Sequence, residues 1–495
     1  MKKYFYIPTG NKVWLDVAID LFDRGIAEPV LWLGDDRHYP KAKKFFGKAA
    51  LSKQEYVFYP ERLKSINYKG ENADFFLSEN YLRAKDRCLK MMDRLDLYGT
   101  FSRVDRDVIF NKLTMCLLKK IDQTKPDALV MSEMPHAHTF YLIYEICLYM
   151  NIEIIKFRTW LPVPLMFIQN IRTGERQNKG EFTNNLSQQM RETISNYVYS
   201  FSSKESMDNY EQPSMKIQRL DAKWKNAVIY FFRAGLLALI KEYWFQTRMY
   251  FNQYYYPINP YKIGVFGRSR NKRLRRKNLI KEFNKNYETI NLDSKYIYFA
   301  LHFEPEKTTN PDGGEFHDQA IALAKLRELV PDGIDIFVKE HPTHFYQPER
   351  GSRGRSPLLY DYISNIDGVK LVPKETNSIE LIKKSIFVST ITGSVSFESA
   401  IMGKQSLIFG DAWFHGLPNV TLWNSNLAYE DIITKEVSTP DEILEFLLSV
   451  EELNSIPGCK NISAQKKFSN YLNANFDKEE FNGISHLLEG FFSKL

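Results

Sequence analysis

Short apolar runs alternate with helical patterns along residues 1–160. Runs such as Ala128–Met131 are typical of buried strands, whereas the apolar residues of Lys12–Phe22 repeat at the spacing of one helix face. This alternation indicates βαβ units and a mostly parallel, Rossmann-like sheet. The predicted strands are Tyr4–Pro8, Pro29–Leu33, Tyr56–Tyr59, Ala128–Met131 and Glu153–Phe157. The predicted helices are Lys12–Phe22 and Thr139–Met150, with a long charged helical stretch at Tyr81–Asp122 between them.

The same alternation returns in the second half of the chain and predicts a second Rossmann-like layer. Its predicted strands are Tyr296–His302, Ile334–Lys339, Val369–Val372, Ile386–Ser389 and Ser406–Phe409, and its predicted helices are Phe316–Leu329, Ser378–Lys384 and Ser396–Met402. The last stretch, Asp441–Leu495, is helical in pattern and contains no predicted strand. We expect these terminal helices to pack back against the first domain.

A chain of 495 residues is long for one hydrophobic core, so two large domains are expected. The predicted fold class is α/β, with two Rossmann-like domains facing a cleft, a helical insertion, and C-terminal helices on the first domain. The expected divisions are an N-terminal Rossmann-like domain at 1–180, an aromatic and basic helical insertion or bridge at 181–290, a C-terminal Rossmann-like domain at 291–440, and terminal helices at 441–495.

The composition is that of a globular protein, with 44% hydrophobic and 26% charged residues. The four cysteines are scattered, without CxxC or CxH spacing, so neither a disulfide framework nor a zinc site is predicted. The apolar run near the N-terminus is too short for a signal peptide, and no run reaches the roughly 18 apolar residues of a spanning helix. A cytoplasmic protein is expected.

The middle of the chain combines aromatic and basic residues. Lys223–Tyr256 mixes Trp, Tyr and Phe with Lys and Arg, which suits either a helix in a membrane interface or core packing between domains. The basic run Arg268–Lys277 would meet anionic lipid headgroups, a phosphate-linked lipid acceptor or only solvent. Both alternatives stay open, so peripheral contact with the inner face of the cytoplasmic membrane is one expectation. Nucleic-acid binding fits poorly, because no nucleic-acid motif accompanies the local charge.

Two motifs follow predicted strands of the second layer, where open α/β sheets bind their ligands. Lys339-Glu340-His341-Pro342 ends one strand; His341 could donate to a phosphate oxygen, Lys339 add charge and Glu340 orient the imidazole. The alternative is a structural turn with an exposed histidine. Near the next strand end, a turn of small hydroxyl residues and glycine precedes a helix and suits a phosphate, or is an ordinary N-cap. Its candidate residues are Thr390, Thr392, Gly393, Ser394, Ser396 and Glu398.

The role of Glu398 has two readings: it could hold a ribose hydroxyl, or be an acid favoured in the first turn of a helix. Other candidates in the same cleft are His302, Glu304 and Glu306, which follow a predicted strand, and Asp312. They could contact donor or acceptor.

Residues 296–420 resemble the capsular polysaccharide biosynthesis glycosyltransferases. The likeness rests on Leu301–Glu306, Val338–Pro342 and Ser389–Ser394, with Glu398 and Gly403-Lys404. That family is GT-B-like and related to bacterial Kdo transferases. The His-Pro dipeptide and the hydroxyl cluster are also similar to the CMP-phosphate motifs of bacterial sialyl- and polysialyltransferases, although Asp312-Gly313-Gly314 matches their acidic motif only in part.

The resemblance implies a glycosyltransferase that moves a sugar from a nucleotide-activated donor to a growing capsule or lipopolysaccharide glycan. Domain 291–440 would bind the donor and domain 1–180 the acceptor. A CMP-linked acidic sugar such as Kdo or a sialic-acid-like sugar is favoured. The open alternatives are a UDP-sugar transferase, a UDP-sugar epimerase or hydrolase of GT-B-like fold, and a non-catalytic partner in polysaccharide assembly or export.

Glycosyl transfer needs a base for the acceptor hydroxyl, and the first domain offers one at a strand end. Glu133 is the preferred base and His136 its partner or an acceptor ligand; a capped helix start is the alternative. Asp312 and Glu304 compete from the second domain. Asp105-Arg106-Asp107 has the DxD spacing of metal-dependent transferases but lies in a charged helical stretch, so a solvated helix face is the better interpretation. No metal and no cofactor beyond the donor is expected.

Overall fold

The computed structural model places two compact units, Met1–Asn196 with Leu447–Leu495, and Tyr197–Phe446. It describes residues 1–58, 60–64, 66–95, 101–160, 163–182, 187–202, 240, 265–306, 308–346, 354–460 and 462–495. The aromatic segment Lys223–Tyr256 lies outside the described residues except for Ile240. Helices α6 (Gln188–Ser202) and α19 (Pro440–Asn454) each run across a boundary between the two units.

The described strands of the first unit form one sheet in the order β12-β5-β4-β3-β1-β2. Strands β2, β1, β3 and β4 are parallel, whereas β5 runs antiparallel to β4 and β12 antiparallel to β5. The bounds are β1 Lys2–Ile7, β2 Ala27–Trp32, β3 Ala128–Met131, β4 Glu153–Trp160, β5 Leu165–Asn170 and β12 Ile456–Pro457. The predicted parallel layer is confirmed, and β5 and β12 extend it.

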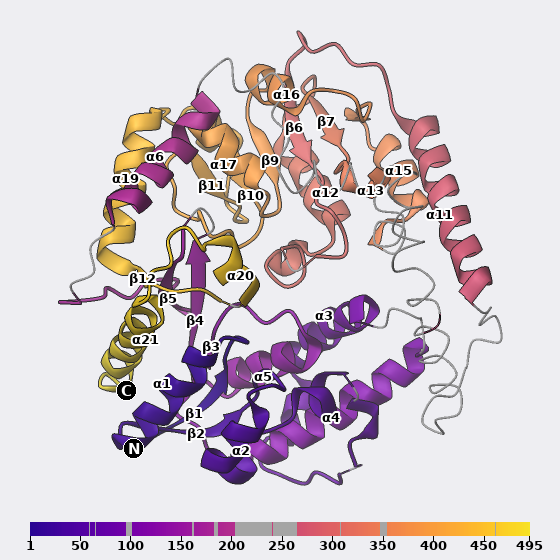
Figure 1. Ribbon diagram of the computed structural model, residues 1–495. Coiled ribbons are helices and arrows are strands. Elements are labelled where there is room, and N and C mark those ends of the chain that lie inside the picture. Colours follow the sequence, from indigo (N-terminus) through magenta and orange to yellow (C-terminus); the bar gives the residue numbers. More distant parts are fainter. Residues whose placement is uncertain are drawn as a thin grey trace. The chain divides into compact units, whose positions relative to one another are not determined.

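Helices cover both faces of this sheet (Figure 1). Along β1, Phe5 and Ile7 face the core under α3, α4 and α5, whereas Tyr4 and Tyr6 face α1 and α21, as the two-residue period of a strand requires. The helices are α1 Lys12–Asp23, α2 Tyr39–Phe46, α3 Glu79–Leu95, α4 Arg103–Thr124, α5 His138–Tyr149, α20 Ile462–Lys467 and α21 Phe476–Phe492, with short 3-10 turns at Gly47–Ala49, Pro60–Arg62 and Ala73–Leu77. Since α21 packs on α1, the C-terminal helices do return to the first domain.

Two sequence predictions for this unit were wrong, and the structure divides a third. The predicted strand Tyr56–Tyr59 is a π-helical turn at Gln54–Phe58, with Tyr59 outside the described residues. An apolar run this short does not distinguish strand from helix, and the edge of β2 instead bridges to Ala50. The helical stretch Tyr81–Asp122 is two helices, α3 and α4, because Ser102 and Asp105 form a capping box that starts α4. The C-terminal region does contain a strand, β12.

The second unit has a parallel sheet in the order β11-β10-β9-β6-β7-β8. The bounds are β6 Tyr296–Ala300, β7 Asp335–Lys339, β8 Val369–Leu371, β9 Val388–Thr390, β10 Ser406–Ile408 and β11 Val420–Leu422. The chain adds β7 and β8 on one side of β6 and then returns to add β9, β10 and β11 on the other. This is the doubly wound order of a Rossmann fold, with its switch point between β6 and β9.

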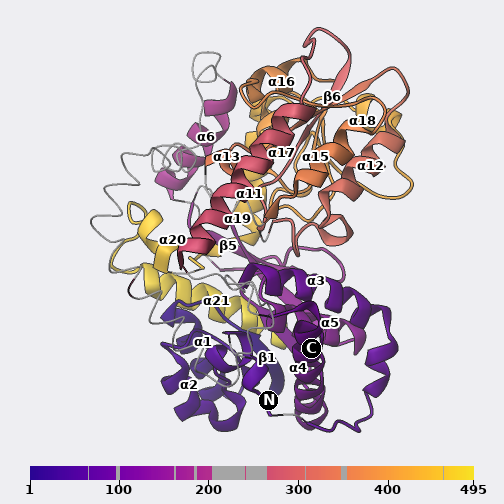
Figure 2. The same cartoon turned by 90° about the vertical axis from the view of Figure 1, so that its right-hand side faces the viewer.

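Helices flank this second sheet as well. They are α11 Val265–Asn286, α12 Gln319–Leu329, α13 Thr343–Tyr346, α15 Pro357–Ser364, α16 Ser378–Lys384, α17 Ser394–Ile401 and α18 Glu430–Ile433, with a 3-10 turn at Gly314–Phe316. Helix α11 packs along α15 (Figure 2), and its Leu279 and Phe283 enter the core. The predicted elements of this layer are confirmed within one to three residues; β11 was not predicted. None of the described helices is long and apolar enough to cross a membrane.

Candidate functional site

The carboxyl ends of β6, β7 and β9 meet at the switch point of the second sheet. His302 follows β6, Glu340 and His341 follow β7, and Thr392 and Gly393 follow β9. The ladder between β6 and β7 pairs Ala300 with Lys339, and the next backbone hydrogen bond runs from Leu301 N to Lys339 O at 3.0 Å. The sheet topology therefore brings together the two motifs that the sequence placed at separate strand ends.

His302 is buried and ties the end of β6 to the turn after β9. Its Nε2 accepts a hydrogen bond from Thr392 N at 3.0 Å and lies 3.1 Å from Thr390 Oγ1, while Thr390 Oγ1 also bonds Ala300 O at 3.0 Å. Burial lowers the pKa of His302 to about 3, and the nearby His341 and Arg355 act in the same direction. The imidazole is therefore neutral at physiological pH.

His341 lies beside Phe303, with ring centroids 5.9 Å apart. Its Nδ1 accepts a hydrogen bond from Thr343 N at 3.3 Å. Burial lowers the pKa of His341 to about 4, although Glu340 opposes the shift. This imidazole is also neutral, so any help that it gives to an anion comes from an N–H dipole.

Glu340 forms a buried network that sequence reasoning did not foresee. Its carboxylate receives Arg355 Nη2 at 3.0 Å and the Tyr360 hydroxyl at 2.7 Å, and Arg355 Nε lies 2.8 Å from Oε2. Burial by itself would raise the pKa of Glu340, but Arg355, His344 and Tyr360 hold it below its usual value. Glu340 also accepts the backbone N–H of His341 at 2.7 Å, so it orients the His341 backbone and not its imidazole.

Lys339 points to the loop before α16. Its Nζ donates to Thr376 O and to Ser378 Oγ, both at 2.6 Å, and burial lowers its pKa to about 8. In this arrangement Lys339 holds the chain between β8 and α16, and phosphate binding by this lysine stays a prediction. Arg355, which is buried and bonds His302 O at 2.6 Å, was missed because no local pattern marks it.

Helix α17 begins at the turn after β9 with Gly393 as its N-cap and no side-chain cap. A Cβ at Gly393 would lie 2.8 Å from Thr390 Oγ1 and 3.4 Å from His302 Nε2, so only glycine allows this close approach. The positive end of the α17 dipole therefore lies against His302, a place that favours an anion.

The other predicted donor residues have mixed surroundings. Ser394 Oγ donates to Glu398 Oε1 at 3.0 Å, whereas Ser396 Oγ is buried 2.6 Å from Ser406 Oγ. Thr392 Oγ1 donates to Thr308 O at 2.6 Å. The Asp312 segment reaches the same region, because a Cβ at Gly410 would lie 2.6 Å from Asp312 O and 2.7 Å from Thr392 Cγ2.

The two acidic candidates after β6 belong to the local scaffold. Glu304 is buried; its Oε1 accepts Gln319 Nε2 at 3.1 Å and its Oε2 accepts Glu306 N at 3.4 Å. Glu306 Oε2 accepts the hydroxyl of Thr308 at 3.2 Å. Gln319 also accepts His302 N at 2.7 Å, so these contacts hold the chain that carries His302.

In the first unit, Glu133 and His136 follow β3, the strand next to β1. Glu133 Oε1 lies 3.5 Å from His136 Nδ1, and Glu133 Oε2 accepts Lys460 Nζ at 3.2 Å. All three side chains are partly exposed. Lys460 comes from the C-terminal segment and was not a sequence candidate, because nothing near it predicts that it returns to β3.

The DxD spacing is part of a helix. Asp105 completes the capping box of α4, and Asp107 Oδ1 lies 3.2 Å from Lys85 Nζ. Over the ranges that the structure describes, no group of three or more His, Cys, Asp or Glu side chains is arranged to hold a metal ion.

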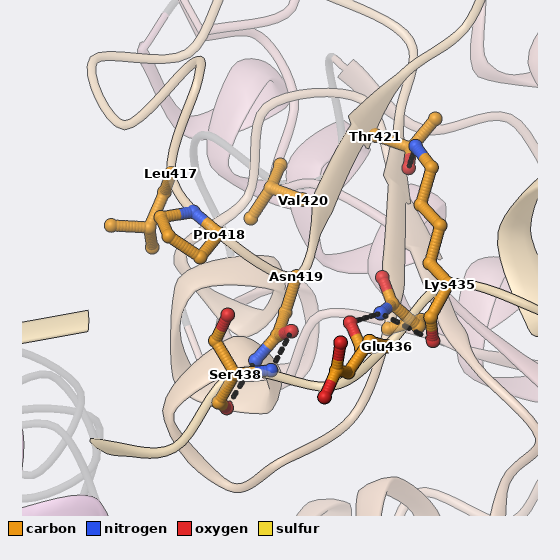
Figure 3. A pocket seen from close by; sticks show the side chains of 9 residues that line it. Leu417, Pro418, Asn419, Val420, Thr421, Lys435, Glu436 and Ser438 are labelled. Atoms are coloured by element: carbon orange, nitrogen blue, oxygen red, sulfur yellow. Dashed lines mark hydrogen bonds between the residues drawn. The ribbon is translucent and has the colours of Figure 1, made fainter. Parts of the chain in front are cut away.

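A pocket of about 330 Å³ lies elsewhere in the second unit (Figure 3). Gln405 and Asn419, which line it, precede β10 and β11, so it opens at the amino ends of these strands. Lys435, another lining residue, donates to Thr421 Oγ1 at 2.9 Å. The predicted donor residues do not line this pocket, which is at the opposite end of the strands from His302.

No family model and no curated protein matches the sequence. Among solved structures, the chain is similar to two KpsC enzymes from Thermosulfurimonas dismutans. Identity to the β-Kdo 2,7 transferase is 16%, over 38% of this chain and 55% of that chain, with a TM-score of 0.23. Identity to the β-Kdo 2,4 transferase is 12%, over 64% and 78%, with a TM-score of 0.24. The chain thus spans little more than half the length of the first.

A UDP-GlcNAc 2-epimerase from Neisseria meningitidis, bound to UDP-GlcNAc, is 11% identical over 100% of both chains, with a TM-score of 0.20. The neighbours therefore include Kdo transferases, which are relatives of the family that residues 296–420 resemble. At these TM-scores the likeness to each of the three structures is weak.

Proposed function

We propose that the protein is a glycosyltransferase of GT-B-like type, which transfers a sugar from a nucleotide-activated donor to a growing surface polysaccharide. The main support is the convergence of His302, His341 and the start of α17 at the switch point of the second sheet. Ligands of open α/β sheets bind at this place, and N–H groups gathered there suit a phosphate.

The breaking bond is the one between the sugar and the phosphate oxygen. As it breaks, the electron pair stays on that oxygen, and the phosphate gains negative charge. N–H donors already fixed in position stabilise this charge without reorganising, which is how preorganised sites lower a barrier. His341, Gly393 and the neighbouring hydroxyl residues would contact the leaving phosphate.

The proposed donor is a CMP-linked acidic sugar, such as Kdo or a sialic-acid-like sugar. Its phosphodiester bears one negative charge, which suits uncharged imidazole donors and a helix N-terminus. The resemblance of the His-Pro and hydroxyl motifs to CMP-binding enzymes points the same way. A UDP-sugar, with two charges on its diphosphate, is the competing donor.

The acceptor would be the growing glycan, and Glu133 the base that takes its hydroxyl proton. Glu133 lies at the carboxyl end of a parallel strand and keeps partial exposure, as a group that meets a substrate must. The chemistry is proposed to be metal-independent; unchanged turnover in EDTA would support this, and loss of turnover restored by Mg²⁺ would contradict it.

A first experiment compares the melting temperature with CMP, UDP, GDP and ADP. Stabilisation by CMP alone supports the proposed donor, stabilisation by UDP alone moves the proposal to a UDP-sugar, and no shift with any nucleotide contradicts it. His341→Ala should then abolish transfer in a folded protein; full turnover would contradict the phosphate role of His341. Consumption of UDP-GlcNAc without an acceptor would identify an epimerase or hydrolase instead. A non-catalytic binder would turn over neither a CMP-linked sugar nor UDP-GlcNAc.

The protein is also proposed to act at the inner face of the cytoplasmic membrane. The basic run Arg268–Lys277 belongs to α11, on which Arg275 and Lys277 are exposed, whereas Arg276 Nη2 donates to Phe345 O at 2.6 Å. Co-sedimentation with vesicles that contain anionic lipid, lost in Arg275→Glu/Lys277→Glu, would support this contact. Equal binding to neutral vesicles would contradict it.

A further inference from the structure

His302 and His341 have their protons on opposite ring nitrogens. A nitrogen that accepts a hydrogen bond from a backbone N–H carries no proton. Nε2 of His302 accepts from Thr392 N, so its neutral ring is protonated at Nδ1. Nδ1 of His341 accepts from Thr343 N, so its neutral ring is protonated at Nε2.

Each remaining N–H is aimed away from the contacts that fix its ring. Within the described ranges, neither Nδ1 of His302 nor Nε2 of His341 has a hydrogen-bond partner in the protein. A buried N–H donor without an acceptor costs free energy, so an acceptor on a ligand would be favourable here. Both rings are thus anchored by one nitrogen and leave the other to a ligand.

The two histidines occupy matching places after neighbouring strands. His302 and His341 each follow the registered pair Ala300–Lys339 by two residues on adjacent parallel strands. Besides burial, the charged form of His341 lowers the pKa of His302. The start of α17 lies at the anchored side of the His302 ring, where a Cβ at Gly393, the N-cap, would lie 3.4 Å from Nε2. One small anion at these two strand ends could meet both remaining N–H groups.

We propose that His302 and His341 bind one phosphate group together, as a pair of neutral N–H donors, His302 through Nδ1 and His341 through Nε2. This makes His302 a binding residue and not only a brace for the turn after β9. The identity of the ligand as a nucleotide sugar rests on the proposed function, whereas the binding of a phosphate by the pair does not.

Amide substitutions separate the two nitrogens of each ring, because an Asn amide reaches the position of Nδ1 and a Gln amide that of Nε2. His302→Gln keeps an acceptor for Thr392 N and loses the donor; His302→Asn does the reverse. For His341 the pattern inverts: His341→Asn keeps the acceptor for Thr343 N, and His341→Gln keeps the donor. The paired variants therefore test binding and bracing independently.

The measurement is calorimetric titration of inorganic phosphate and of CMP, together with the melting temperature of each unliganded variant. We expect His302→Gln and His341→Asn to melt like the wild type and to bind both probes roughly ten- to hundredfold more weakly. We expect His302→Asn and His341→Gln to melt lower but to keep most of the affinity. His486→Gln, in the first unit, is the matched control and should bind as the wild type does.

Wild-type affinity for both probes in His302→Gln or in His341→Asn would overturn the pair, as would a wild-type protein that binds neither probe. The proposed function fails differently. If the protein binds phosphate through both histidines but transfers no sugar, the histidine pair is supported and the proposed transferase function is wrong. If His302→Gln transfers sugar with wild-type kinetics, the transferase function is supported and the histidine pair is wrong.

Discussion

Nε2 of His302 lies 3.0 Å from the backbone nitrogen of Thr392 and accepts its hydrogen bond. The contact joins residues 90 positions apart in the chain and fixes the turn after β9 against the end of β6. Because the same bond decides which ring nitrogen of His302 carries the proton, the fold of the turn and the chemistry of the site are linked.

Acid should destabilise the protein through His302. Its pKa is about 3 in the folded state, against a reference of 6.5, so between these values the unfolded chain holds a proton that the folded protein lacks. Stability is therefore highest above pH 6.5 and falls as the pH is lowered, by about 2 kcal/mol for this group between pH 7 and pH 5. Urea unfolding at both pH values measures it, and His302→Gln should lose correspondingly less. An equal loss in both proteins would show that His302 is not the cause.

In the buried network around Glu340, loss of the Arg355 cation should lower the stability more than loss of the Tyr360 hydroxyl. Arg355→Met leaves the Glu340 carboxylate buried without its cation, for which about 3–5 kcal/mol is expected. Tyr360→Phe removes one hydrogen bond to the same carboxylate, at about 1.5–3 kcal/mol. Urea unfolding gives both values. Glu340→Gln/Arg355→Met should recover part of the lost stability. A double variant that is less stable than Arg355→Met alone would argue against the network.

Gly393→Ala tests the close approach of the turn to the sheet. The φ of Gly393 is −70°, which alanine adopts freely, so the backbone angle is no obstacle. The obstacle is steric, because the added Cβ would lie only 2.8 Å from Thr390 Oγ1. We expect a loss of about 1–3 kcal/mol in stability and weaker CMP binding, because the start of α17 must shift. Thr390→Ala/Gly393→Ala removes the obstructing hydroxyl and should restore part of the stability and part of the affinity for CMP. If the single variant is as stable as wild type, the turn is looser than the structure indicates.

Glu133→Gln tests the general base. Transfer should fall by roughly 10²–10⁴-fold, while the affinity for CMP stays at the wild-type value, because the proposed nucleotide site belongs to the other unit. Asp312→Asn is the matched variant for the competing base. Loss of transfer only in Asp312→Asn would move the role to the second unit. Lys460→Met, which removes the cation beside Glu133, should change the pH dependence of transfer if Glu133 is the base.

Much of the fold could be predicted from the sequence because period and strand length are local properties. The strands and helices around residues 296–409 match their predicted bounds closely, and the helices α1 and α5 do as well. The prediction failed where the local signal is ambiguous: Tyr56–Tyr59 is apolar enough for a strand, but the edge of β2 is occupied by Ala50. β12 was missed since its two residues gain strand geometry only by pairing with β5.

The sequence by itself determined that Lys339–Pro342 and Thr390–Ser394 follow strands, and so lie at one end of a parallel sheet. Only the tertiary structure decided which strands are neighbours, and this placed His302 between the two motifs. It also decided that Lys339 turns to Thr376 and that Glu340 pairs with Arg355. Hydrogen bonds between distant residues and the burial of charge depend on the whole sheet, so no local pattern of residue types reveals them.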